Sequence, residues 1–137
     1  MNYINTFITV APDCPATEGV VPPGRGGTRS IPRIEYELLS CRPYHYTQEE
    51  LQFAVYLERE GLAPTGKERQ ALWDAFFSKP RACLRTSALL KKYGWGLHFD
   101  EQGKIALVAV NTAEYRKFQT SKTLKVLAAA RSSKKTS

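Results

Sequence analysis

Apolar runs along the chain predict three strands. In residues 3–10, apolar and β-prone residues occupy both sets of alternate positions, which is typical of an internal strand with two buried faces. Residues 93–99 and 104–110 form two further runs, and the four residues between them end in Gly103, which suits a turn position with positive φ. The pattern therefore predicts a hairpin over 93–110 that joins residues 3–10 in a small antiparallel sheet.

Helical periodicity and capping residues predict helices around these strands. Ser30 is placed to cap a helix that begins at Ile31 and ends before Pro43. Thr47 and Thr65 are each followed three residues later by glutamate, which is the spacing of a capping box. Further helices are expected after Ser87, within 111–118 with Tyr115 and Phe118 facing inward, and from Ser121 onward with Leu124, Leu127 and Ala128 facing inward.

Two segments fit more than one period. Residues 51–58 match both a helix and a strand, and we predict a short helical turn followed by a strand at Gln52–Glu58. Residues 81–86 alternate, so an extended backbone there places Arg81, Cys83 and Arg85 on one face.

The organisation expected is a single α+β domain over residues 1–131, with a small antiparallel sheet and helices packed on one face. A chain of 137 residues has the usual size of one domain. Residues 11–30 form a Pro/Gly-rich loop, since eight of those twenty residues are proline or glycine, and loops of this length are commonly functional or disordered. Residues 132–137 are expected to form a basic disordered tail.

Charge is distributed unevenly over the chain. The net charge is +7, but residues 1–78 carry seven Lys and Arg against ten Asp and Glu, while residues 79–137 carry thirteen against three. A basic half of this strength favours an anionic partner such as nucleic acid, a phosphorylated ligand or an acidic protein. The commoner alternative is a solvated basic surface without a partner.

Basic and aromatic residues alternate in the middle of the basic half. Cations that follow phosphates and rings that stack on bases are typical of single-stranded nucleic-acid binding, although no recognised nucleic-acid motif is present. Trp95 shares a face with apolar neighbours in its strand, which favours burial. We expect a binding module with a basic surface for nucleic acid or a phosphorylated ligand, with these contacts: Arg81, Arg85, Lys91, Lys92 and His98.

Cys83 supports an alternative hypothesis, a thiol-dependent enzyme or redox protein. Two flanking arginines on the same strand face favour a thiolate, and His98 is the nearest candidate base, with Asp100 or Glu101 to orient it. A cysteine buried as a small hydrophobic residue is the commoner case. The spacing of Cys14, Cys41 and Cys83 does not indicate a metal site, and no cofactor fingerprint occurs, so we expect neither a metal nor a cofactor.

The chain contains no apolar run of about 18 residues, the length needed to cross a bilayer, and its first residues lack the pattern of a secretion signal. We expect a cytoplasmic protein without membrane contact. An odd number of cysteines agrees with free thiols in a reducing compartment.

Several short motifs together resemble one family. They lie in residues 6–15, Glu35–Leu39, Phe77–Pro80, Ala82–Arg85, Lys92–His98 and Gly103–Leu107. Their combination is similar to the uncharacterised family called domain of unknown function 6157, over Tyr3–Arg131. The resemblance implies one domain along the chain, and it carries over no activity, ligand or site residue.

Overall fold

The computed structural model describes residues 3–24 and 29–131. Within them, four strands form one open sheet: β1 (Thr6–Thr9), β2 (Trp95–Phe99), β3 (Ile105–Ala109) and β4 (Lys125–Ala128). Their order is β3-β2-β1-β4. The predicted hairpin and its antiparallel pairing with residues 6–8 are confirmed, and β4 adds a parallel strand on the far side of β1. The sheet is therefore mixed.

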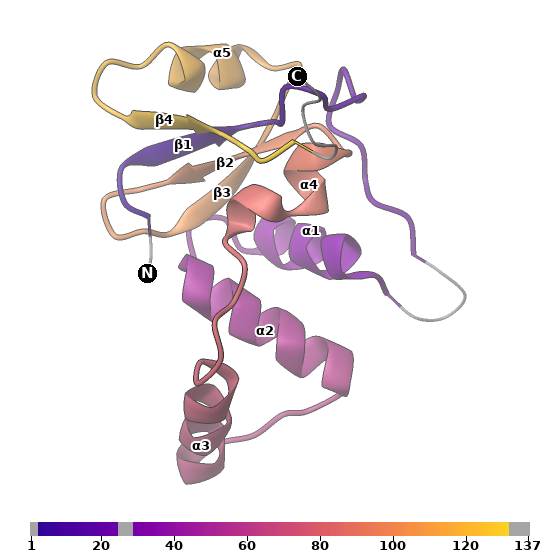
Figure 1. Ribbon diagram of the computed structural model, residues 1–137, viewed down its shortest axis with the longest axis vertical. Coiled ribbons are helices and arrows are strands. Elements are labelled where there is room, and N and C mark those ends of the chain that lie inside the picture. The colour runs from indigo at the N-terminus through magenta and orange to yellow at the C-terminus, as the bar shows by residue number, and fades with distance from the viewer. Residues whose placement is uncertain (1–2, 25–28, 132–137) are drawn as a thin grey trace.

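The described residues also form five α-helices (Figure 1): α1 (Ile31–Cys41), α2 (Gln48–Glu60), α3 (Gly66–Phe76), α4 (Ala88–Lys91) and α5 (Ala113–Gln119). The predicted caps hold at Ser30, whose side chain accepts from the N–H of Arg33, and at Thr47, which forms a full capping box with Glu50. Thr65 is the N-cap of α3 without a side-chain bond. The predicted α+β class and single domain are confirmed.

One face of the sheet packs on α1, α2 and α4. Its strands contribute Ile8, Leu97, Phe99 and Ile105, all nearly inaccessible to solvent. Apolar residues of the helices complete this cluster: Ile34, Leu39, Leu51, Val55, Leu89 and Leu90. This cluster has more buried residues than the other two and is the main core of the molecule. Burial of each such side chain stabilises the fold by about 1.5–3 kcal/mol.

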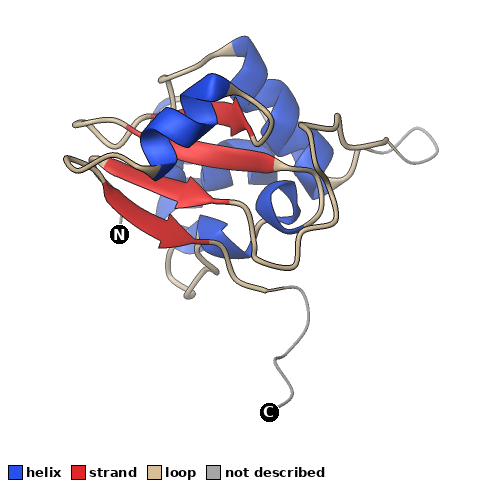
Figure 2. Cartoon of the chain, turned by 90° about the horizontal axis from the view of Figure 1, so that it is seen from above, coloured by secondary structure: helices blue, strands red, loops and turns tan. Residues whose placement is uncertain are grey.

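The opposite face is covered by α5, so helices flank the sheet on both sides rather than on one (Figure 2). Phe7 packs edge-on against Tyr115 at a centroid distance of 5.1 Å. Gly96 allows this close approach, because a Cβ there would lie 2.9 Å from both rings. The sequence predicts this helix with Tyr115 and Phe118 facing inward, but its periodicity does not indicate which face of the sheet the helix covers.

The strand predicted for Gln52–Glu58 is wrong, because the segment is part of α2. Leu51 and Val55 face the main core, while Phe53 and Leu57 face α3. A helix buried on two sides places apolar residues at 51, 53, 55 and 57, and this spacing imitates the period of a strand.

The helix predicted from Ser121 is also wrong, because residues 125–128 form β4. The hydroxyl of Ser121 does accept bonds from the N–H groups of Thr123 and Leu124, as a cap would. However, the following backbone pairs with β1: Lys125 N–H donates to Asn5 and Ala129 N–H donates to Thr9. The free edge of β1 thus decides the conformation of a segment with helical periodicity.

Residues 81–86 are not a strand, and Leu84–Thr86 form a 3₁₀ turn. Two side chains of α2 satisfy the backbone polar groups of this segment, so it needs no partner strand: Gln48 Oε1 accepts from Leu84 N–H at 2.9 Å, and Gln52 Nε2 donates to the carbonyl of Ala82 at 2.6 Å. The anchored segment forms one wall of the site.

Candidate functional site

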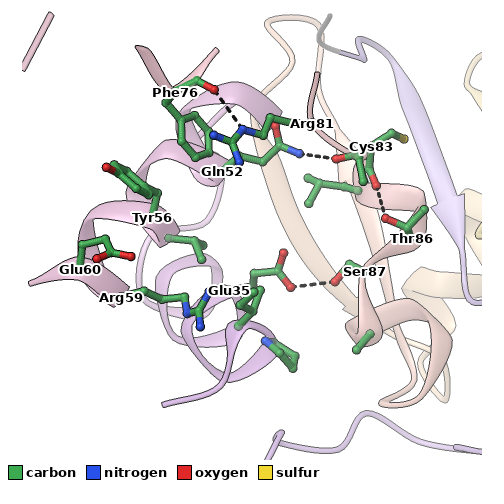
Figure 3. Close-up of a pocket in the computed structure, with 16 residues that line it drawn as sticks. Glu35, Gln52, Tyr56, Arg59, Glu60, Phe76, Arg81, Cys83, Thr86 and Ser87 are labelled. Atoms are coloured by element: carbon green, nitrogen blue, oxygen red, sulfur yellow. Dashed lines mark hydrogen bonds between the residues drawn. The ribbon is translucent and has the colours of Figure 1, made fainter. Parts of the chain in front are cut away.

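A cavity of about 460 Å³ opens between α1, α2 and residues 81–88 (Figure 3). We call it the Glu35 cavity, after the carboxyl group that it contains. Its lining combines apolar surface from residues such as Val55, Phe76 and Leu84 with several polar and charged side chains. A volume of this size is typical of small-molecule sites.

Glu35 is a buried carboxyl group on α1. Its Oε1 accepts a hydrogen bond of 2.8 Å from the hydroxyl of Ser87, which also caps α4. No printed hydrogen bond reaches Oε2, and no side-chain oxygen of the described residues is both fully buried and unpaired, so Oε2 retains access to the cavity that Glu35 lines; in Figure 3 it points away from Ser87. Burial raises the pKa of Glu35 to about 7, and the bond from Ser87 opposes this rise.

Arg81 is held against Phe76 in the cavity wall. Its Nε donates to the Phe76 carbonyl at 3.0 Å, and its guanidinium carbon lies 3.8 Å from the centre of the Phe76 ring. Arg59, in the last turn of α2, lines the same cavity. Neither arginine belongs to any of the four ion pairs found among the described residues. Both guanidinium groups are therefore available to an anion.

The other predicted contact residues lie elsewhere. Arg85 Nε donates to the carbonyl of Ala128 at 2.9 Å, and the Arg85 carbonyl accepts from Ala130, so this arginine ties the 3₁₀ turn to β4. Lys91 and Lys92 lie at the end of α4, outside the cavity lining. Of the five residues predicted as ligand contacts, only Arg81 lines the Glu35 cavity.

The structure does not bring Cys83 and His98 together. Cys83 Sγ lies 2.8 Å from the hydroxyl of Tyr3, which packs on Phe99 beside the main core. His98 pairs with Phe7 across β1 and β2 and stacks on Phe118 of α5, on the opposite face of the sheet. Because the two side chains contact different faces of the sheet, the arrangement of thiol and base proposed from the sequence does not form.

Each of these two side chains has its own partner. Cys83 Sγ also accepts from the N–H of Arg85 and is turned away from the cavity in Figure 3. Burial, followed by the bond to Cys83, raises the pKa of Tyr3 to about 12. His98 Nδ1 lies 2.8 Å from the hydroxyl of Tyr44, and burial lowers the pKa of the imidazole. All three cysteines are free.

The N-terminal loop covers the ring of Trp95, so this ring is not exposed for stacking on a base. Its ring packs on Tyr36 at a centroid distance of 5.5 Å, and its Nε1 donates to the carbonyl of Val20. Gly19 lies so close that a Cβ would be 2.8 Å from the indole. Residues 19–20 thus cover this ring. Positions 25–28 of the predicted 11–30 loop lie outside the described residues.

Sequence reasoning missed Glu35 and Ser87. A signal for Glu35 was present, because it lies four residues before Leu39 and next to Ile34, on the side of α1 that faces the core. An acidic residue within an apolar stripe is a candidate buried carboxyl group. Its bond to Ser87, 52 positions later, has no local signal at all.

The comparisons with known proteins add a family. The model of the family described as "Family of unknown function (DUF6157)" matches residues 1–135. No curated protein and no solved structure matches the chain. In the part of the chain that the structure describes, no helix is long and apolar enough to cross a membrane.

Proposed function

The chain belongs to the family of unknown function (DUF6157), and we propose from its own geometry that it is a binding module for a small phosphorylated ligand. The site is the Glu35 cavity, with Arg59 and Arg81 as the groups that hold the anion. We also propose that the protein acts in the cytoplasm, where its free cysteines remain reduced.

The observation that carries this proposal is a cavity of ligand size whose lining includes Arg59 and Arg81, neither of which belongs to an ion pair among the described residues. Arginine offers planar, multiple N–H donors that match the oxygens of a phosphate. The contact with Phe76 fixes the guanidinium group of Arg81 before the ligand arrives, which lowers the conformational entropy lost on binding. Excess positive charge in residues 79–137 attracts an anion over a longer range.

Single-stranded nucleic acid fits this geometry less well than a small ligand. Base stacking requires exposed rings, whereas Trp95 lies under residues 19–20 and His98 stacks on Phe118. The cations of α4 and Arg81 do not share one cavity. The proposal therefore takes a phosphorylated small molecule as the partner, and it keeps nucleic acid as an outcome of the test.

The test is a calorimetric titration of the protein with inorganic phosphate and a panel of organic monophosphates, at about 50 and about 200 mM salt. We expect binding by members of the panel and a loss of about tenfold or more in affinity for Arg81→Gln, because a hydrogen bond to a charged group contributes about 1.5–3 kcal/mol. Arg42→Gln is the matched control, since Arg42 is exposed and lies outside the cavity lining.

Thermal melts of both variants verify that they are folded. Equal affinity of Arg81→Gln and the unmodified protein for every monophosphate would contradict the proposal. A parallel titration with labelled single-stranded nucleic acid covers the other partner. Tight binding there, with a steep salt dependence and no effect of Arg81→Gln, would favour a nucleic-acid surface instead.

A further inference from the structure

Glu35 is a buried carboxyl group that forms no ion pair among the described residues. Ser87 gives it a single hydrogen bond. The titratable or charged side chains that line its cavity are Tyr56, Arg59 and Glu60 on α2, and Arg81 of the 81–88 segment; Cys83 also belongs to the lining, but its thiol is turned away. Burial raises its pKa, and the bond from Ser87 lowers it.

A carboxylate in such a place is costly unless a positive group meets it. Buried charges in proteins are paired, coordinate a metal or become neutral by taking up a proton. In the described residues there is no cluster of three or more His, Cys, Asp or Glu to hold a metal ion. Oε2 faces the open cavity, so a group that enters with the ligand can reach it.

We propose that the ligand is an amine-bearing phosphate monoester, with its phosphate on Arg59 and Arg81 and its ammonium group on Oε2 of Glu35. The inference rests on the proposed function and names the class of ligand. The cavity then satisfies both ends of one molecule: cationic side chains without anionic partners face the phosphate, and a carboxyl group without a cationic partner faces the ammonium.

This pairing links binding to a proton. In the empty protein, burial keeps a proton on Glu35 up to a pH of about 7. A bound ammonium group favours the carboxylate, so the proton leaves when the ligand binds. Affinity for the amine-bearing ligand therefore rises as the pH increases through about 7, and it declines only when the amine itself loses its proton at about pH 10.

The experiment uses a series of aminoalkyl monophosphates of increasing chain length, each beside the alkyl monophosphate of the same length. Titration calorimetry at about pH 6 and about pH 8, on either side of the pKa of Glu35, measures both affinities. We expect the best aminoalkyl phosphate to bind at least about tenfold more tightly than its partner at the higher pH, with a smaller ratio at the lower pH. Buffers with different ionisation enthalpies count the released protons.

Glu35→Gln keeps the side-chain size and an acceptor for Ser87 but removes the negative charge. We expect this variant to lose the preference for the amine and the proton release, while it retains binding of the alkyl phosphate. Glu60→Gln is the matched control, because Glu60 lines the same cavity but is exposed. That variant keeps the preference.

Three results overturn the inference, and they are distinguishable. Alkyl and aminoalkyl phosphates that bind equally, both through Arg81, leave the proposed function intact and exclude an ammonium site at Glu35. If neither series binds, the proposed function fails together with the inference. A preference for the amine that persists in Glu35→Gln also overturns it, because another group would then receive the ammonium.

Discussion

Glu35 shows how one residue acquires a property through its surroundings. Its sequence neighbours place it on the inner side of α1, and the contact with Ser87 orients one carboxyl oxygen. Removal from water favours the neutral acid, so its pKa rises from 4.5 to about 7. The same residue on the outer side of α1 would remain an ordinary surface carboxylate.

This rise gives the folded protein a defined dependence on pH. Between about pH 4.5 and 7, unfolding releases the proton that the folded state retains, so the free energy of unfolding decreases as the pH increases through that window. Above about pH 7 the free energy of unfolding decreases no further, and its total decrease is about 3 kcal/mol. Glu35→Gln removes the linkage. We expect it to be more stable than the unmodified protein at about pH 8, with a flatter profile, in urea unfolding followed by circular dichroism.

Glu37 is the control position for this measurement, because its carboxylate is held by Arg29 and Arg33 at the surface of α1. The ion pair with Arg29 lowers the pKa of Glu37, so Glu37→Gln has the opposite sign: it removes stability that is present above about pH 4.5. A Glu35→Gln variant that is less stable at all pH values would contradict the assignment.

At the scale of elements, β4 depends on its neighbour. Leu124, Leu127 and Ala128 have the spacing of a helix. However, without β4 the edge of β1 would leave its backbone groups unpaired, and the segment pairs with them as a strand instead. The N–H groups of Lys125 and Ala129 both donate to β1, and the direction of the N–H group alternates from one residue to the next along a strand. Leu127 N–H therefore points toward β1, and Val126 N–H points away. Proline at position 127 therefore removes a hydrogen bond to β1, whereas proline at position 126 does not.

We expect Leu127→Pro to destabilise the protein by about 1–3 kcal/mol, because it removes a ladder hydrogen bond, and Val126→Pro to cost clearly less. Urea unfolding of the two variants measures the difference. The comparison is internally controlled, since both changes introduce the same ring into the same strand. Equal losses would contradict the parallel pairing of β4 with β1.

At the scale of the molecule, α3 projects from the body of the domain (Figure 1). It packs on α2 through an aromatic cluster that includes Phe53, Trp73, Phe76 and Phe77. No residue of α3 belongs to the main core or to the cluster under α5. The fold thus contains a helical extension held by a small cluster, beside a sheet buried on two faces.

Hydrogen exchange measured by mass spectrometry tests this division. Amides of α3 are expected to exchange faster than those of β2, because few buried contacts must be broken to open the helix. Trp73→Ala should accelerate exchange in α3 and leave β2 unchanged, since the indole packs on Phe53 and Phe77. Equal protection of both segments would show that α3 unfolds only with the whole domain.

The sequence by itself determined the features that depend on local interactions. The caps at Ser30 and Thr47, the hairpin around Gly103 and the helix with Tyr115 and Phe118 all follow from neighbouring residues, and the structure confirms them. Arg81, which the sequence predicts as a ligand contact, lines the cavity, and its role as a contact stays a prediction.

Only the tertiary structure decided the features that depend on distant partners. Burial of α2 on two sides, the pairing of β4 with β1 and the support of residues 81–86 by Gln48 and Gln52 override local periodicity. The meeting of Glu35 with Ser87 and the separation of Cys83 from His98 by the sheet are of the same kind. Contacts between residues far apart in the chain leave no trace in spacing, because the energy that fixes them appears only once the core has formed.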